Sequence, residues 1–324
     1  MSIRRRLASA ALALAASALL FAGPAASAAT HRNSPYTGAV SASAADGRVL
    51  FSDRPGAEAY IASVTKLMTL LLVVEDVAAG RYGFDSYATA TPEAYYSEPS
   101  WVGLKAGEKM SVRDLCRALM VESANDAAIV LGVNSAGSLK AFVERMNARA
   151  AELGMTGTVY HNPNGLPPNP KRRYPWKSFN VSTASDQLKL ALEMLRHPEA
   201  MEFMSIKTCD LVKTPWGFRT SVTRRVNEPL AKTALAENER LVKSMCNHNN
   251  VMCKDKLKVF NDDGREAVDG MKTGYIDAGG SSVVLTGQRG GKRAVVVVLG
   301  SSTAVERDAN ARRLMEDALA ALDW

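Results

Sequence analysis

The chain is poor in the residues that usually bind metals. Its 324 residues include four histidines and four cysteines, and they contain no Cys-x-x-Cys and no His-Glu-x-x-His spacing. Each spacing would bring two ligands within reach of one ion, so their absence argues against a metal site. We therefore expect neither a metal nor another cofactor.

Other signatures are also missing. The Gly-x-Ser-x-Gly elbow of α/β-hydrolases does not occur, and we find no internal repeat and no linker long enough to separate two domains. The composition, 47% hydrophobic and 23% charged, is that of an ordinary globular protein with ample material for a core. After the first 28 residues, we expect one domain over residues 29–324.

The N-terminal segment has the pattern of a secretory signal peptide. Three arginines at 4–6 precede an Ala/Leu-rich run to Ala22, and Ala26-Ser27-Ala28 is a small-residue cleavage pattern. An uncleaved membrane anchor is the alternative, because the apolar run approaches the roughly 20 residues that a membrane span needs. Cleavage after Ala28 would leave 296 residues with a net charge of about +4, so nucleic acid is not an indicated partner. We expect an exported protein, soluble after cleavage, in the periplasm or another extracytoplasmic cell-wall compartment.

The four cysteines would then meet an oxidising compartment. Cys116 lies in the apolar stretch LCRALMV and is predicted to be a buried free thiol. Cys209, Cys246 and Cys253 fall in one polar region and could supply a disulfide. The sequence leaves their pairing open.

Strand patterns lie at both ends of the chain, and helical patterns lie between them. Residues 38–52 alternate around Asp46-Gly47 and predict a hairpin, residues 281–300 predict a second one, and residues 304–322 predict a closing helix over the sheet. The expected inner helices span 63–79, two segments within 111–133 separated by the polar residues 122–126, 138–155, and a helix that starts near Ser182 or Thr183 and ends at Pro198. Residues 201–269 give mixed signals. The order predicts an α+β fold with one antiparallel sheet, in which the terminal strands pair and a helical lobe is inserted.

The stretch ASVTKLMT places Ser63 and Lys66 three residues apart at the start of an apolar helix. Residues at this spacing share a helix face. A serine needs an adjacent base to act as a nucleophile, and a lysine becomes such a base when burial or a nearby cation lowers its pKa. No other Ser-x-x-Lys occurs in the chain. The alternative is a lysine whose amine merely reaches solvent from the helix end.

Two further polar triplets follow in order. Ser123-Ala124-Asn125 lies between two expected helices, where Ser123 and Asp126 could instead only cap a helix beginning at Ala127. Lys272-Thr273-Gly274 lies directly before the second hairpin, where it could be an ordinary loop leading into a strand. The combination Ser-x-x-Lys, Ser-x-Asn and Lys-Thr-Gly is the set found in penicillin-binding proteins and serine β-lactamases.

On these triplets, and on the segments GLKAGEKMSVRDL, NPNGLP and VDGMKTGYIDAGG, the sequence resembles the secreted D-alanyl-D-alanine carboxypeptidases, the low-molecular-mass penicillin-binding proteins, from about Ala39 to Leu322. The resemblance implies a β-lactamase/transpeptidase-like fold with the active site in a cleft between sheet and helical lobe. It also implies removal of the terminal D-alanine from peptidoglycan pentapeptide stems and covalent inhibition by β-lactam antibiotics. Some relatives add a C-terminal β-domain, which we do not expect here.

By the same resemblance, Ser63 is expected to be the acylated nucleophile and Lys66 its base, and Ser123 is expected to pass a proton to the leaving D-alanine. Substrate binding falls to Asn125, Lys272, Thr273 and Gly274, with Arg307 as a further carboxylate partner. The backbone N–H groups of Ser63 and Tyr275 are expected to form the oxyanion hole. Two departures stand out: Ile276 replaces the family's usual threonine, and the interval between Asn125 and Lys272 is long.

Three other functions compete with this interpretation. A class A β-lactamase would need a Glu-x-x-Leu-Asn carboxylate, but the corresponding stretch reads YHNPNGLPP. A D,D-endopeptidase uses the same groups and remains open, and a silent wall-binding protein would be expected to lose one of them. We interpret His161, His248 and the Lys171–Arg173 cluster as solvated loop residues.

Overall fold

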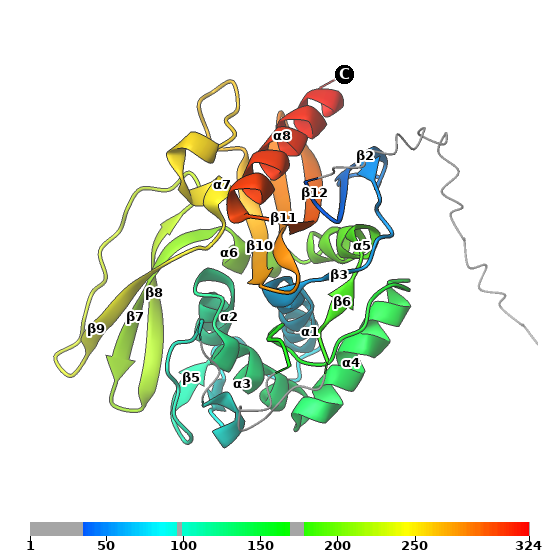
Figure 1. The fold of residues 1–324 in the computed structure, drawn as a ribbon. Helices are drawn as coiled ribbons and strands as arrows, with labels where there is room; N and C mark the ends of the chain where they lie inside the picture. The colour runs from blue at the N-terminus through cyan, green and yellow to red at the C-terminus, as the bar shows by residue number, and fades with distance from the viewer. Residues whose placement is uncertain (1–34, 96–98, 169–177, 324) are drawn as a thin grey trace, which may run out of the picture. The chain divides into compact units, whose positions relative to one another are not determined.

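The strands expected at the two ends of the chain pair with each other in a five-stranded sheet. The structure is a computed structural model that describes residues 35–95, 99–168 and 178–323. The sheet has the order β10-β11-β12-β1-β2, with β1 antiparallel to both β12 and β2 (Figure 1). Its strands are β1 (Gly38–Ser43), β2 (Val49–Asp53), β10 (Val268–Ile276), β11 (Gly280–Arg289) and β12 (Lys292–Ser301). Both predicted hairpins are confirmed.

The valine run of β12 explains why this sheet is covered on both faces. Side chains alternate along a strand, and Val296 and Val298 contribute to one core with the closing helix α8 (Ala304–Leu322). Val295 and Val297 contribute to a second core with α1 (Lys66–Ala78) and α5 (Ala184–Met194). Strands buried on both faces read as continuous apolar runs, as this one does.

The expected helices are present, with shifted ends. The first begins as the short 3-10 helix η1 (Ala62–Thr65) before α1, and Gly80 follows its end with a φ of +70°. Pro198 does not end a helix but begins a separate one, since α5 stops at Met194. The other helices are α2 (Val112–Val121), α3 (Asn125–Ala136), α4 (Leu139–Glu152), α6 (Pro198–Met204) and α7 (Asn250–Cys253), with 3-10 turns η2 (Pro92–Ala94) and η3 (Asp255–Leu257).

The prediction of a single sheet is wrong, because a second five-stranded sheet has the order β4-β5-β8-β7-β9. It contains β4 (Tyr87–Thr89), β5 (Lys109–Ser111), β7 (Ile206–Thr214), β8 (Gly217–Arg225) and β9 (Arg240–Cys246), the last three being long strands in the interval that was hard to interpret. Their sequences are rich in Lys, Arg and Thr, and β9 is largely exposed. They therefore lack the apolar periodicity that would mark them as strands. A two-stranded pair joins β3 (Ala59–Tyr60) to β6 (Val181–Ser182).

All four cysteines are free, so the structure does not contain the disulfide considered for Cys209, Cys246 and Cys253. Cys116 is buried as predicted, and burial raises the pKa of its thiol. The signal-peptide prediction for residues 1–28 and the cluster at 171–173 lie outside the described residues. Within the described part of the chain, no helix is long and apolar enough to span a membrane.

Candidate active site

The expected contact between Ser63 and Lys66 is present. Lys66 Nζ lies 2.8 Å from Ser63 Oγ, across the junction between η1 and α1. Lys66 is fully buried, so its amine does not reach solvent from the helix end. A buried amine in direct contact with a hydroxyl is the arrangement that a serine nucleophile and its base require.

Two oxygens from other elements hold the amine of Lys66 from the remaining sides. Nζ donates to Asn125 Oδ1 at 2.8 Å, at the start of α3, and to the carbonyl oxygen of Asn164 at 2.7 Å. Because neither acceptor has a proton to give, a neutral amine must use its two N–H groups on them. Its lone pair then points toward Ser63.

The surroundings favour this neutral amine. Burial lowers the pKa of Lys66 well below its ordinary value, and the charge of Lys272 lowers it further, whereas Asp126 opposes the shift. Loss of hydration disfavours the charged form of any buried lysine. The arrangement can therefore take a proton from Ser63.

The loop that supplies Asn164 was missed as part of the site. Asn162 Oδ1 accepts from the Gly165 amide at 2.6 Å, and Asn180 Nδ2 donates to Thr65 Oγ1 at 2.9 Å and to the Asn162 carbonyl at 2.9 Å. Gly165 has a φ of +81°, and a Cβ atom there would lie 1.8 Å from the carbonyl oxygen of Ala62. The signal was available in the NPNGLP motif, which places glycine where the loop backbone meets η1.

Ser123 has the backbone of a strained, functional position. Its φ is +59°, a left-handed conformation that costs a non-glycine residue roughly 1–3 kcal/mol. Its hydroxyl is buried, with no hydrogen-bond partner in the described part of the chain. Ala62, directly before Ser63, also has a positive φ, of +45°. Such strain occurs where the surrounding structure fixes a side chain in one orientation.

The Lys272-Thr273-Gly274 triplet packs against the segment of Ser63 at Gly274. Lys272, Thr273 and Gly274 lie inside β10, so the alternative of a loop leading into a strand is wrong. A Cβ atom on Gly274 would lie 3.1 Å from the amide nitrogen of Ser63, which shows how closely β10 packs on η1. β10 is also an edge strand of its sheet. The backbone of an edge strand can pair with an extended peptide.

Positive charge gathers around Lys272, in the middle of this strand. Burial, together with the charge of Arg307, lowers the pKa of Lys272 to about 7. Arg307 is itself buried in the first turn of α8, where Nε donates to Asp308 Oδ1 at 2.7 Å. The charge of Arg307 therefore acts on Lys272, and Asp308 balances part of it.

Asp126 does not cap a helix at Ala127, because α3 already begins at Asn125. Its buried carboxylate accepts the backbone N–H groups of residues 102–104, at 2.9–3.2 Å, and that of Ala127 at 2.9 Å. Burial raises its pKa, and the backbone hydrogen bonds oppose that shift. Asp126 therefore anchors the backbone of residues 102–104 beside the start of α3, close to Asn125.

His248 is exposed, as expected of a loop residue, but the cations of the site affect its charge. Partial burial, together with the charges of Lys272, Lys66, Lys243 and Arg307, lowers the pKa of His248 to about 4. The flanking Asn247 and Asn249 are buried: Asn247 Nδ2 donates to the Ile206 carbonyl at 2.9 Å, and Asn249 Oδ1 accepts from the Val251 amide at 3.2 Å. They hold the segment in place.

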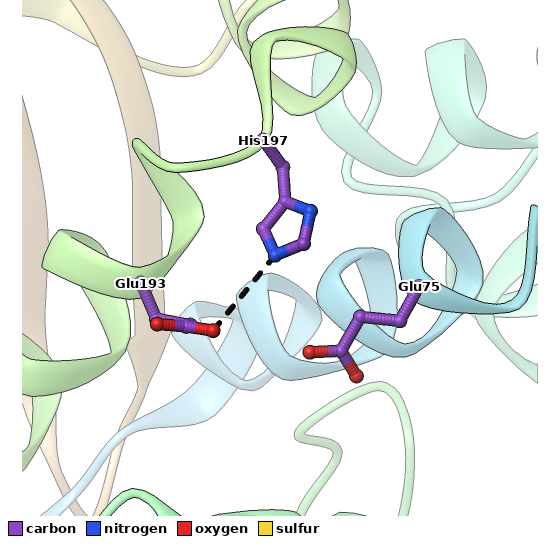
Figure 2. Close-up of side chains that lie close together, drawn as sticks. All are labelled: Glu75, Glu193 and His197. Atoms are coloured by element: carbon purple, nitrogen blue, oxygen red, sulfur yellow. Dashed lines mark ion pairs between the residues drawn. The ribbon is translucent and has the colours of Figure 1, made fainter. Parts of the chain in front are cut away.

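Within the described residues, one group of possible metal ligands lies close together, formed by Glu75, Glu193 and His197 (Figure 2). Nη2 of Arg149 lies 2.7 Å from a carboxylate oxygen of Glu75 and 2.7 Å from one of Glu193. The guanidinium already pairs with the two acids that an ion would need. We assign this group a structural role in joining α1, α4 and α5.

Comparisons with known proteins agree with this geometry. The family model described as D-alanyl-D-alanine carboxypeptidase, Peptidase S11, matches residues 27–238. The carboxypeptidase DacF of Bacillus subtilis is 26% identical over 270 residues, covering 83% of this chain and 58% of DacF, so the chain spans less than two thirds of that relative. A D-alanyl-D-alanine endopeptidase of Pseudomonas aeruginosa is 33% identical over 153 residues, 47% of this chain and 45% of its own.

A solved structure extends the agreement to the whole fold. Ampicillin-bound penicillin-binding protein D2 of Listeria monocytogenes is similar with a TM-score of 0.66 and 27% identity, covering 89% of this chain and 99% of that one. The α+β transpeptidase-like fold is thereby confirmed, and so is the resemblance inferred from the three triplets. The chain belongs to the D-alanyl-D-alanine carboxypeptidase family of S11 peptidases.

Proposed function

We propose that this protein is a serine-type D-Ala-D-Ala carboxypeptidase that removes the terminal D-alanine from peptidoglycan stem peptides through an acyl-enzyme on Ser63. The observation that carries the proposal is the 2.8 Å contact between Ser63 Oγ and the buried amine of Lys66. No metal or other cofactor has a part in the reaction.

In the first step, Ser63 Oγ attacks the carbonyl carbon of the penultimate D-alanine, and Lys66 takes the hydroxyl proton. The negative charge that forms on the carbonyl oxygen is stabilised by the backbone N–H groups of Ser63 and Tyr275. Such donors are typically worth about 3–4 kcal/mol each in the transition state.

In the second step, the C–N bond breaks, and the leaving D-alanine amine takes up a proton. The unpartnered Ser123 hydroxyl delivers it, and Lys66 restores the proton to Ser123. Asn125 has a double role, because it orients Lys66 through Oδ1 while its amide group holds the substrate. Water then attacks the ester carbonyl on Ser63, which releases the shortened peptide and returns the proton to Ser63.

The carboxylate of the leaving D-alanine binds beside Lys272 of β10, where Thr273 adds a hydroxyl and Arg307 adds positive charge. Gly274 lets β10 approach η1, because a Cβ atom there would lie 2.6 Å from the Ile61 carbonyl oxygen, and so it brings the substrate-binding strand next to Ser63.

β-Lactam antibiotics acylate the same serine, and we expect the adduct to be long-lived. The carboxylate whose charge affects Lys66 is that of Asp126, and its oxygens are engaged by four backbone amides. A carboxylate held in this way is a poor base for the water that would hydrolyse the adduct, which disfavours a β-lactamase.

Cleavage of peptidoglycan cross-links is the second candidate. The P. aeruginosa endopeptidase is more identical to this chain than DacF, over a shorter segment. The two activities share their chemistry and differ in the leaving group, which is free D-alanine in one case and a cross-linked peptide in the other.

We further propose that residues 1–28 export the protein to an extracytoplasmic compartment, where stem peptides are found. N-terminal sequencing of the protein from the producing cells tests the cleavage: a mature chain beginning at Ala29 supports export with cleavage, whereas an intact Met1 contradicts cleavage and supports the uncleaved anchor.

The test of the activity combines labelled penicillin with peptide mapping. The label is expected on Ser63 and is expected to be absent from Ser63→Ala, whereas label on another residue overturns the assignment. Release of free D-alanine from diacetyl-L-Lys-D-Ala-D-Ala supports the carboxypeptidase. Cleavage of a cross-linked dimer without D-alanine release supports the endopeptidase, and rapid release of hydrolysed penicillin supports a lactamase.

A further inference from the structure

A pocket of about 620 Å³ lies at the end of the five-stranded sheet, next to the candidate active site but beyond its triplets. It is lined by the turn between β10 and β11 (277–280), by residues 58–60 leading toward η1, and by the end of β12 (300–302). The pocket therefore adjoins the last residues of the strand that carries Lys272 and the segment that carries Ser63.

The pocket has the opposite charge from the region around Lys272. Its lining contains two carboxylates, Glu58 and Asp277, and no lysine, arginine or histidine among the described residues. Asp277 Oδ1 accepts from the Tyr275 hydroxyl at 2.7 Å, which fixes this carboxylate beside the turn. From Lys272, inside β10, to Asp277, directly after its end, the charge thus changes from positive to negative.

A buried hydroxyl provides an independent sign of a polar ligand. Ser301 lines the pocket and is fully buried, and its Oγ has no hydrogen-bond partner in the described part of the chain. A buried hydroxyl without a partner costs free energy that a bound polar group can recover.

The direction of the substrate follows from the proposed function. With the leaving carboxylate near Lys272 and the reacting carbonyl between the Ser63 and Tyr275 amides, the remaining peptide must continue along β10 toward Asp277. A ligand that ends in a carboxylate and carries a cation farther back matches this order of charges.

We propose that the pocket binds the side-chain ammonium group of the third stem-peptide residue, so that the enzyme prefers stems whose diamino acid is free over stems in which it is acylated. This inference rests on the proposed function and adds a substrate-specificity site formed by Glu58 and Asp277, with Ser301 as an additional hydrogen-bonding group.

The distances agree with this placement. Thr273 and Asp277 are four residues apart on a strand or at its end, which corresponds to about 13 Å. In an extended stem, the third residue lies two positions before the terminal one, about 7 Å away, and a four-carbon side chain adds about 6 Å.

An apolar wall suits the methylene groups of such a side chain. Tyr60 lines the pocket and stacks on Phe179, with ring centroids 4.3 Å apart and an interplanar angle of 22°. Long cationic side chains commonly lay their apolar stems along such surfaces and hold the charged group near a carboxylate.

The experiment compares kcat/KM for D-alanine release from Nα-acetyl-L-Lys-D-Ala-D-Ala and from its Nα,Nε-diacetyl form. We expect the free ammonium to be preferred by about three- to tenfold, as for two partly exposed ion pairs, with the preference falling at high salt. Glu58→Gln and Asp277→Asn should each reduce the ratio, and Glu58→Lys should bring it below one. Asp277→Asn keeps an oxygen for the Tyr275 hydroxyl.

The matched control is Glu237→Gln, an exposed acid in the loop between β8 and β9, which should keep the wild-type ratio. Equal turnover of the two peptides by the wild type, or a ratio that Glu58→Lys leaves unchanged, overturns the pocket assignment while the carboxypeptidase stands. Release of D-alanine from neither peptide overturns both.

Discussion

Asn125 Oδ1 lies 2.8 Å from Lys66 Nζ and joins the start of α3 to the start of α1. A neutral amide at this position lets Lys66 lose its proton, whereas a carboxylate would stabilise the protonated amine. In Asn125→Asp, we expect the pKa of Lys66 to rise, because the new carboxylate stabilises the charged amine. Acylation by labelled penicillin, which needs the neutral amine, should then require a higher pH, and its rate at pH 7 should fall at least about tenfold.

Substitution of the neighbouring acid, Asp126, should shift the pKa of Lys66 in the opposite direction. The charge of Asp126 raises the pKa of Lys66, so Asp126→Asn should move the ascending limb of the pH–rate profile to lower pH. An asparagine keeps one oxygen for the amides of residues 102–104. If both substitutions move the limb in the same direction, Lys66 is not the group that titrates.

The descending limb is expected to report Lys272. Its pKa of about 7 means that it loses its proton as the pH rises through neutrality, and carboxylate binding should weaken, so that KM increases. Because Arg307 contributes to lowering this pKa, Arg307→Gln should move the increase in KM to higher pH. Arg313→Gln, on the same helix but exposed, is the control, and an identical shift in both variants would contradict the assignment.

The sequence predicted the chemistry of the site better than it predicted the architecture of the fold. Ser63 and Lys66 could be paired in advance because helical spacing alone brings residues three apart together. Terminal strand pairing could also be predicted, since the apolar runs of β11 and β12 are long. The contacts to Asn164 and the cations around His248 depend on residues about 100 and 180 positions from Lys66, which no local pattern reports. The second sheet was missed because half-exposed strands such as β8 are rich in polar and charged residues.

Gly165 is predicted to be indispensable to the site. Gly165→Ala would place a methyl group 1.8 Å from the Ala62 carbonyl oxygen, so the loop and the Asn164 carbonyl must move away from Lys66. Gly264→Ala is a matched control, because Gly264 has a φ of +77° and open space around it. The control should lose about 1–2 kcal/mol of unfolding free energy from its conformation alone. Gly165→Ala should lose about 2 kcal/mol more, because of overpacking, and should acylate slowly.

Urea unfolding and penicillin acylation of the two variants provide the measurements. Equal stability of the two variants, with acylation of Gly165→Ala at the wild-type rate, would show that the loop is not held against η1.

His248 is predicted to make the folded protein sensitive to acid. Its pKa is about 4 in the folded chain and about 6.5 in an unfolded one, so between these values the unfolded chain binds more protons. The contribution of His248 to stability is therefore complete above about pH 6.5 and is lost as the pH falls toward 4. His248→Gln should reduce the pH dependence of the urea midpoint in this window. In Lys272→Met, NMR titration of the imidazole should show a higher pKa, and an unchanged value would contradict the proximity of the two groups.

The Arg149 network is expected to stabilise the packing of α1, α4 and α5 rather than to bind an ion. In Arg149→Met, the carboxylates of Glu75 and Glu193 lose their shared counter-charge while about one fifth of each side chain remains exposed. Such a partly buried pair should cost about 1–3 kcal/mol, between the values for surface and buried ion pairs. Lys140→Met, which removes an exposed pair on the same helix, should change the unfolding free energy by less than about 0.5 kcal/mol. If the repulsion between the two acids causes the loss, the double variant Arg149→Met/Glu193→Gln should be more stable than Arg149→Met alone, and a double variant that is less stable would refute this account.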